Sequence, residues 1–155
     1  MNFLFACGGT AGHINPALAV AGRLRELMPD CGILFVGADF NMEQDLVPRS
    51  GYDIITLRVN SLRRSRSPKA MCHNVKALVN VFRGKHKAKK ILSSFAPDVV
   101  LGTGGYVCYP VLKAASELGI PTAVHESNAV PGLTTKMLSE VVDVIMVGFE
   151  ESKKY

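Results

Sequence analysis

The sequence predicts an α/β fold, a doubly wound parallel sheet covered by helices on both faces. Short apolar runs alternate with longer helical patterns along the whole chain, and most of these runs are apolar on both faces. Parallel strands buried on both faces have this pattern, and the helices between them form right-handed crossovers. The chain has 155 residues, of which 48% are hydrophobic and 20% are charged, as expected of one globular domain.

Six strands and five helices follow from this alternation. The predicted strands are NFLFAC at 2–7, GILFVG at 32–37, DIITL at 53–57, DVVLG at 98–102, PTAVH at 121–125 and VDVIMVG at 142–148. Apolar residues at helical spacing predict helices near 15–28, 41–49, 69–94, 105–118 and 131–140. The one long irregular stretch, VNSLRRSRSPK at 59–69, predicts a mobile loop before the third helix.

Cysteine spacing and hydropathy exclude several classes of protein. Cys7, Cys31, Cys72 and Cys108 form no CxxC pair and no metal-ligand spacing, so we expect buried, reduced thiols of a cytosolic protein. No window approaches the ~20 apolar residues that span a bilayer, and the first residues do not resemble a signal peptide. We therefore expect a soluble chain with no metal site and no cofactor.

Basic residues are concentrated in one segment. Between Ile54 and Pro97 there is no Asp or Glu, while 11 of the 18 Lys and Arg residues fall there. This cationic segment on an otherwise acidic domain predicts an anionic partner, whether a phospholipid surface, a nucleic acid or a phosphorylated substrate. Phe82 and Phe95 are the only Phe, Tyr or Trp residues in this segment, so few side chains could stack on nucleic acid bases. We therefore expect no nucleic acid partner.

Three turns that follow strands form the candidate site, because ligands of such sheets gather outside the carboxyl ends of the strands. These turns are GGTAGH at 8–13, GTGGYVCYP at 102–110 and HESNAVPG at 125–132. Glycines in the first turn allow close approach of a ligand, and the amides that open the next helix point toward an anion. This turn also resembles a dinucleotide fingerprint with Asp39 on the ribose, but its glycine spacing does not match.

Each turn taken alone also has a purely structural interpretation. Gly104 and Gly105 would permit tight packing, His125 would be a half-buried histidine with its hydrogen bonds satisfied, and Asn128 would cap a helix. The three turns are nevertheless predicted to converge on one rim of the sheet, and this convergence favours a binding site.

The stretches GGTAGHINPALAVA, MEQDLVP and PDVVLGTGGYVCYPVLKAASELGIPTAVHESNAVPGLTTK resemble the amino-terminal domain of the bacterial N-acetylglucosaminyltransferase family that makes lipid II. The resemblance extends from Phe3 to about Tyr155. Two positions depart from the family: Ala11 stands where glycine is usual, which fits if its φ is negative, and Ser127 stands where glutamine is usual.

This resemblance implies one half of a two-domain enzyme of the GT-B class. Residues 1–155 would be the Rossmann-like, acceptor-binding domain, and a carboxy-terminal domain outside the chain would bind the donor UDP-GlcNAc. The implied reaction transfers GlcNAc, with inversion, to the 4-hydroxyl of lipid I (undecaprenyl-diphosphate-MurNAc-pentapeptide), giving lipid II for peptidoglycan. The implied location is peripheral, on the cytoplasmic face of the plasma membrane. The isolated 155 residues are expected to fold without catalysing transfer.

Inverting transfer needs a base for the attacking hydroxyl and a positive or dipolar environment for the phosphates. His13 is the first candidate base, because an imidazole titrates near neutral pH and a helix start disfavours its protonated form. Glu126 is the alternative base, with His13 then bonding a phosphate or a sugar hydroxyl. The resemblance implies these substrate-binding residues: Thr10, Ala11, Gly12, Gly104, Gly105, Tyr106 and Asn128, the last on sugar hydroxyls.

An apolar stripe lies in the cationic segment. Met71, Val75, Leu78, Val79 and Phe82 share one face of the third predicted helix. Either this face packs on the sheet, or Val75, Val79 and Phe82 meet lipid while neighbouring cations, including Arg83 and Lys85, attract anionic headgroups. An alternative function is also open: a non-catalytic subunit that recruits a split glycosyltransferase to the membrane and pairs with a separate donor-binding chain, which would fit a sequence without the carboxy-terminal domain.

Overall fold

The computed structural model describes residues 1–60 and 67–155, apart from the side chains at positions 68, 70, 76, 78 and 153. Its strands are β1 (Asn2–Cys7), β2 (Gly32–Ala38), β3 (Asp53–Leu57), β4 (Val99–Gly104), β5 (Thr122–Glu126) and β6 (Val144–Val147). Its helices are α1 (Ala11–Leu27), α2 (Glu43–Arg49), α3 (Pro68–Phe95), α4 (Cys108–Glu117) and α5 (Leu133–Leu138), followed by the 3-10 helix η1 (Glu150–Lys154). All the predicted strands and helices are confirmed. Most of the loop predicted at 59–69 lies outside the described residues.

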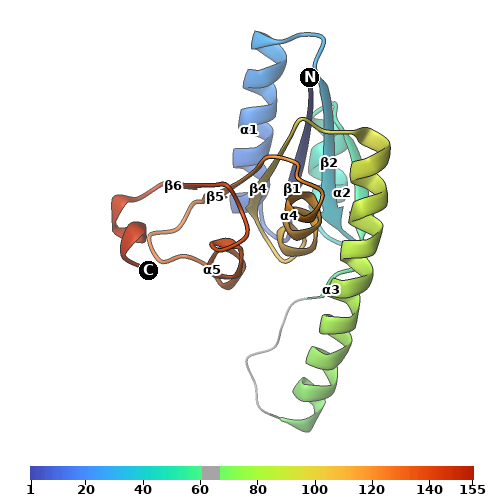
Figure 1. Ribbon diagram of the computed structural model, residues 1–155, viewed down its shortest axis with the longest axis vertical. Helices are drawn as coiled ribbons and strands as arrows, with labels where there is room; N and C mark the ends of the chain where they lie inside the picture. The colour runs from blue at the N-terminus through green and yellow to red at the C-terminus, as the bar shows by residue number, and fades with distance from the viewer. Residues whose placement is uncertain (61–66) are drawn as a thin grey trace.

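The strands form one sheet in the order β3-β2-β1-β4-β5-β6, and every neighbouring pair is parallel (Figure 1). The strand order reverses between β1 and β4. A crevice at such a reversal point is where ligands of doubly wound sheets bind. The turns after β1 and β4 therefore meet side by side at the carboxyl edge of the sheet.

Both faces of the sheet are buried around β1, β2 and β4, which explains the continuous apolar runs of these strands, whereas Val144, Ile145 and Met146 of the edge strand β6 are exposed. Successive side chains of a strand point to opposite faces, so Leu4 joins the core beneath α3 and α4, whereas Phe5 joins the core beneath α1 and α2. On the second face Phe5 stacks on Phe35 of β2, with ring centroids 5.0 Å apart. This two-sided packing fixes the sheet edge that carries the turns.

Helix α1 begins four residues earlier than predicted, at Ala11 rather than near residue 15. Thr10 has extended backbone angles at the N-cap position, and its carbonyl oxygen accepts hydrogen bonds from the amides of His13 (3.0 Å) and Ile14 (3.1 Å). His13 consequently lies within the first turn of α1 and not ahead of the helix.

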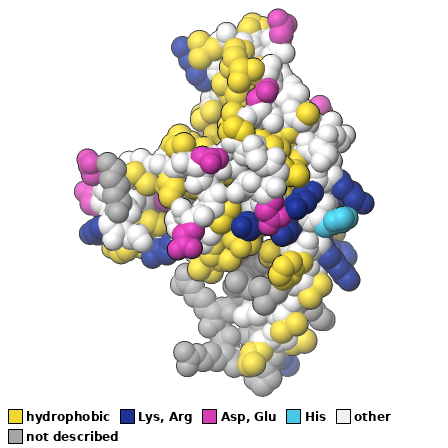
Figure 2. Space-filling view, in the orientation of Figure 1, with side chains coloured by type: hydrophobic (Ala, Val, Ile, Leu, Met, Phe, Trp, Pro, Cys, Tyr) yellow, Lys and Arg dark blue, Asp and Glu magenta, His cyan; other side chains and the backbone are white. Residues whose placement is uncertain are grey.

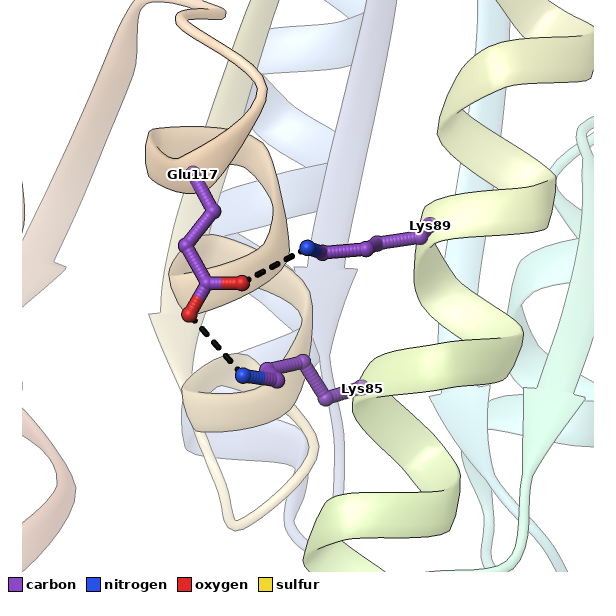
Figure 3. A network of polar contacts seen from close by, with 3 residues as sticks. All are labelled: Lys85, Lys89 and Glu117. Atoms are coloured by element: carbon purple, nitrogen blue, oxygen red, sulfur yellow. Dashed lines mark hydrogen bonds and ion pairs between the residues drawn. The ribbon is translucent and has the colours of Figure 1, made fainter.

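Helix α3 is much longer than the strands, and its first half projects beyond the carboxyl edge of the sheet (Figure 1). Its second half is anchored in the core by Ala88, Ile91 and Leu92. Two lysines add a polar anchor: Lys85 Nζ lies 2.9 Å and Lys89 Nζ 2.8 Å from the carboxylate of Glu117 on α4 (Figure 3). These two hydrogen bonds lower the pKa of Glu117 to about 2.

The predicted apolar stripe of α3 is exposed and does not pack on the sheet, while contact of the stripe with lipid stays a prediction. The exposed fractions are 61% for Val75, 44% for Val79 and 68% for Phe82, while Ala77 and Gly84 face inward. The side chain of Leu78, also assigned to this stripe, lies outside the described residues. Hydrophobic side chains along the projecting half of α3 are visible in Figure 2. Among the described helices, none is both long and apolar enough to cross a bilayer.

The cysteines are free but not uniformly buried. Cys7 and Cys108 lie in the core, where burial raises the pKa of Cys108 to about 12 and raises that of Cys7 as well. The expectation of burial was wrong for Cys31, which is half-buried, and for Cys72, which is exposed. Cys72 is exposed because it lies on the projecting half of α3.

Candidate active site

The three turns meet in one pocket of about 630 Å³ at the carboxyl edge of the sheet. Each turn contributes to its lining: Gly8, Gly9, Thr10 and His13 from the first, Gly104, Gly105 and Tyr106 from the second, and Glu126, Asn128 and Gly132 with Leu133, Thr134 and Thr135 from the third. The predicted convergence is confirmed.

In the first turn, the backbone holds the imidazole of His13. Its Nδ1 lies 3.1 Å from the carbonyl oxygen of Gly8 and 3.3 Å from Oγ1 of Thr10. Because a carbonyl only accepts, a neutral imidazole that bonds Gly8 carries its proton on Nδ1 and leaves a lone pair on Nε2. Thr103 Oγ1 of β4 donates a 2.6 Å hydrogen bond to the His13 carbonyl and fixes this turn of α1 against the sheet.

The second turn requires glycine at two positions. Gly104 and Gly105 have φ values of +121° and +90°, which side-chain-bearing residues rarely adopt. A Cβ on Gly104 would overlap the imidazole ring of His13, and a Cβ on Gly105 would overlap the carbonyl oxygen of Gly8. The structural interpretation of these glycines therefore holds: Gly104 packs against the candidate base, His13, and Gly105 packs against the Gly8 carbonyl that contacts it.

In the third turn, the Glu126 carboxylate organises the loop. Its Oε1 accepts hydrogen bonds from the amide (2.9 Å) and the side-chain Nδ2 (2.8 Å) of Asn128. Its Oε2 accepts from the Gly132 amide (2.9 Å) and from Thr135 Oγ1 (2.7 Å). The side chain is 4% exposed. Both oxygens therefore have two donors each, and together they tie the loop from 127 to 135 to the end of β5.

This network disfavours Glu126 as a base. Burial raises the pKa of Glu126, but the four hydrogen bonds outweigh burial and hold it below the ordinary value of a glutamate. A base needs a lone pair free to receive the proton of the substrate and a pKa near the working pH. Both oxygens of Glu126 already accept two hydrogen bonds, whereas His13 Nδ1 contacts the Gly8 carbonyl and its Nε2 keeps a lone pair, so the geometry favours His13.

The sequence did not single out Glu43, the first residue of α2. Its carboxylate is fully buried beneath the first turn, accepting hydrogen bonds from the amides of Gly9 (3.1 Å) and Ala38 (2.9 Å). A Cβ on Gly8 would overlap this carboxylate. Glu43 lies within the stretch MEQDLVP, but its hydrogen-bond partners are backbone amides. All residue types except proline have such an amide, so no side-chain pattern in the sequence reveals these partners. Asn74 of α3, which also lines the pocket, was not predicted either.

The other predicted residues have less central positions. Ala11 and Gly12 lie in the first turn of α1 next to the pocket, and Ala11 has a helical backbone, so this position does not need glycine. Ser127 Oγ lies 3.4 Å from His125 Nδ1 and does not line the pocket. Asp39 lines a different pocket, with Arg58 and Arg83, and not the one at the glycine turns. The membrane candidates lie along α3: Val75, Val79, Phe82, Arg83 and Lys85.

Within the part of the chain that the structure describes, no group of three or more His, Cys, Asp or Glu side chains is placed to hold a metal ion. The polar character of the pocket comes from backbone amides, one imidazole, hydroxyl and amide side chains, and the carboxylate of Glu126, whose two oxygens each accept two hydrogen bonds from the protein. Such groups suit a phosphorylated or sugar ligand.

Comparison with known proteins agrees with this chemistry. Residues 3–147 match the model of the glycosyltransferase family 28 N-terminal domain. A protein of Caldanaerobacter subterraneus is 48% identical over all 155 residues, and one of Thermoanaerobacter sp. strain X514 is 49% identical. Both carry the name "UDP-N-acetylglucosamine--N-acetylmuramyl-(pentapeptide) pyrophosphoryl-undecaprenol N-acetylglucosamine transferase". The chain spans 42% of the length of each.

Solved structures show the same fold. The crystal structure of Acinetobacter baumannii MurG superposes with a TM-score of 0.82 at 30% identity, covering 97% of this chain and 42% of that one. The UDP-GlcNAc 2-epimerase of Methanocaldococcus jannaschii, at 15% identity and a TM-score of 0.65, shares the fold alone. The family match over residues 3–147 is the decisive finding, and the chain therefore belongs to the glycosyltransferase family 28 N-terminal domain family.

Proposed function

We propose that the chain is the amino-terminal, acceptor-binding domain of an inverting N-acetylglucosaminyltransferase that converts lipid I to lipid II. In this proposal GlcNAc moves from UDP-GlcNAc to the 4-hydroxyl of the muramyl sugar of lipid I, in peptidoglycan synthesis. The observation that carries the proposal is the placement of His13 between the glycine turns of β1 and β4 in one pocket. The family match and the names of the relatives support it. The donor-binding domain is expected in the remaining length that the relatives possess.

His13 serves as the base in this mechanism. The Gly8 carbonyl holds the proton on Nδ1, so Nε2 accepts the proton of the sugar hydroxyl as the new glycosidic bond forms. The hydroxyl oxygen attacks the anomeric carbon from the face opposite to the UDP leaving group, which inverts that carbon.

Backbone amides bind the phosphates. The amides of Ala11 and Gly12 open α1 and have no carbonyl partner within the helix, so with the helix dipole they favour an anion at Thr10. The left-handed backbone at Gly104 and Gly105 orients neighbouring amides, toward Tyr106, in a second concave surface. Asn128, whose Nδ2 is held by Glu126, keeps its Oδ1 for a sugar hydroxyl.

Membrane association completes the proposal. The exposed side chains of Val75, Val79 and Phe82 insert into the cytoplasmic leaflet, and nearby cations such as Arg83 bind anionic headgroups. The protein would thus be peripheral to the plasma membrane, where lipid I is anchored. A recruiting subunit of a split enzyme would show the same surface, but the single-chain relatives favour one two-domain enzyme.

A chimera tests the proposed function. Residues 1–155 would replace the matching segment of the Caldanaerobacter subterraneus relative, and lipid II formation from UDP-GlcNAc and lipid I would be measured. We expect turnover comparable to that of the intact relative and none from residues 1–155 alone. A chimera that binds UDP-GlcNAc but forms no lipid II would refute the assignment.

A further inference from the structure

A second, apolar pocket lies beside the candidate active site, and nothing described so far uses it. We propose that this groove, between α3, α4 and α5, binds the first isoprene units of the polyprenyl chain of the acceptor. This inference rests on the proposed function and adds a lipid subsite to it.

The lining of the groove is mostly apolar or aromatic. It has a volume of about 250 Å³, and its apolar and aromatic lining residues are Val81 and Phe82 of α3, Tyr106 and Tyr109 beside and on α4, and Leu133 and Met137 of α5. Four polar residues complete the lining: Asn60, Lys85, Lys113 and Thr134. Lys85 Nζ is paired with the carboxylate of Glu117 at 2.9 Å. Because most of the lining is apolar, the groove favours an apolar occupant, since a polar ligand would lose its hydration for few hydrogen bonds.

The position of the groove identifies the occupant. One end of the groove shares Tyr106, Leu133 and Thr134 with the active-site pocket, so the two cavities are continuous. Another part of its lining is Phe82, which belongs to the exposed stripe of α3. The relatives are named for an acceptor in which a diphosphate is bonded directly to a polyprenyl chain. A chain leaving a diphosphate at the glycine turns therefore passes through this groove before it enters the bilayer.

Acceptors whose lipid chains are too short to anchor in a bilayer distinguish binding in the groove from binding to the membrane. The chimera would be assayed without vesicles or detergent, using MurNAc-pentapeptide diphosphates that carry either one or three isoprene units. Burial of added methylene groups in the groove should make KM for the longer acceptor roughly tenfold lower, with kcat unchanged. Met137→Gln should abolish most of this difference and leave KM for the one-unit acceptor unchanged.

A matched variant controls for surface polarity. Leu118→Gln replaces a side chain 42% exposed, close to the 43% of Met137, at a position that does not line the groove. It should keep the chain-length effect. Equal KM values for the two acceptors in the unmodified chimera would overturn the proposal, and would be the result if another part of the polypeptide fills the groove. A Met137→Gln variant with kcat reduced equally for both acceptors would overturn it as well. No transfer to either acceptor would refute the proposed function itself.

Discussion

His13 Nδ1 lies 3.1 Å from the carbonyl oxygen of Gly8, within a turn that the side-chain-free Gly104 allows to close over the imidazole ring. This arrangement fixes the tautomer and the position of the ring without help from a carboxylate. It makes the base of the proposed reaction dependent on backbone geometry, which substitutions can test in the chimera described above.

His13→Ala should lower kcat by a factor of ~10²–10⁴, since the proton of the attacking hydroxyl loses its acceptor. KM for UDP-GlcNAc should stay nearly constant, because in the proposed two-domain enzyme the donor is bound mainly by the other domain. His86→Ala, at an exposed position of α3, is the control. Steady-state kinetics decide the outcome, and near-wild-type turnover of the His13 variant would exclude it as the base.

Gly104→Ala should also reduce turnover, by at least about tenfold, because the new methyl group displaces the imidazole and the backbone is strained at φ +121°. Gly119→Ala is a matched control: its φ is +69°, but no atom lies within 4 Å of the added Cβ. It should lose about 1 kcal/mol of folding free energy and keep its activity. Equal kinetic effects of the two substitutions would contradict a role of Gly104 in placing His13.

Glu126→Gln should destabilise the fold, because an amide nitrogen would face two donors that now bond the carboxylate. A loss of about 2–4 kcal/mol in the free energy of unfolding is expected near neutral pH. Thermal and urea melts would measure it beside Glu140→Gln, an exposed acid of the same region. If Glu126 were a catalytic base that held no loop in place, Glu126→Gln would instead lower turnover and leave the free energy of unfolding unchanged.

The difference in free energy of unfolding between the wild type and Glu126→Gln should depend on pH, and the direction of this dependence follows from the pKa of Glu126. The folded-state pKa of Glu126 is lowered, so its contribution to stability is complete above the pKa of the unfolded chain, about 4.3, and is lost as the pH falls through the folded value. The stability gap between the wild type and Glu126→Gln should therefore be constant from pH 6 to 8 and narrow in more acidic solution. A gap that widened on acidification would contradict the lowered pKa.

Replacing Val75, Val79 and Phe82 together by Ser should abolish binding to anionic vesicles and change the melting temperature little, because all three are exposed. Unmodified protein should bind neutral vesicles poorly and should bind anionic ones less as salt is added. The control replaces two exposed apolar residues of α1, Val20 and Leu27, by Ser. Co-sedimentation that is unchanged in the triple variant would rule out this docking surface.

The fold and the location of the site were predictable because both depend on patterns within short segments. Runs such as NFLFAC are buried on both faces, and the turns after β1 and β4 meet wherever the strand order reverses. The start of α1 was missed because the helical apolar pattern begins after the N-cap, Thr10. Glu43 was missed because its partners are amides at Gly9 and Ala38, which no side-chain pattern reveals. The exposure of Phe82 depends on which elements cover α3, information absent from helical periodicity.

Helix α3 also sets a length scale. Its 28 residues extend about 42 Å, at 1.5 Å per residue, from the half that carries the exposed stripe and Asn74, which lines the pocket, to the half held by the core and Glu117. A single helix thus connects the proposed membrane-binding stripe to the domain that carries the glycine turns. In the proposed membrane-bound enzyme, the number of helical turns in α3 would set how far the diphosphate of the acceptor lies from the bilayer when it reaches His13.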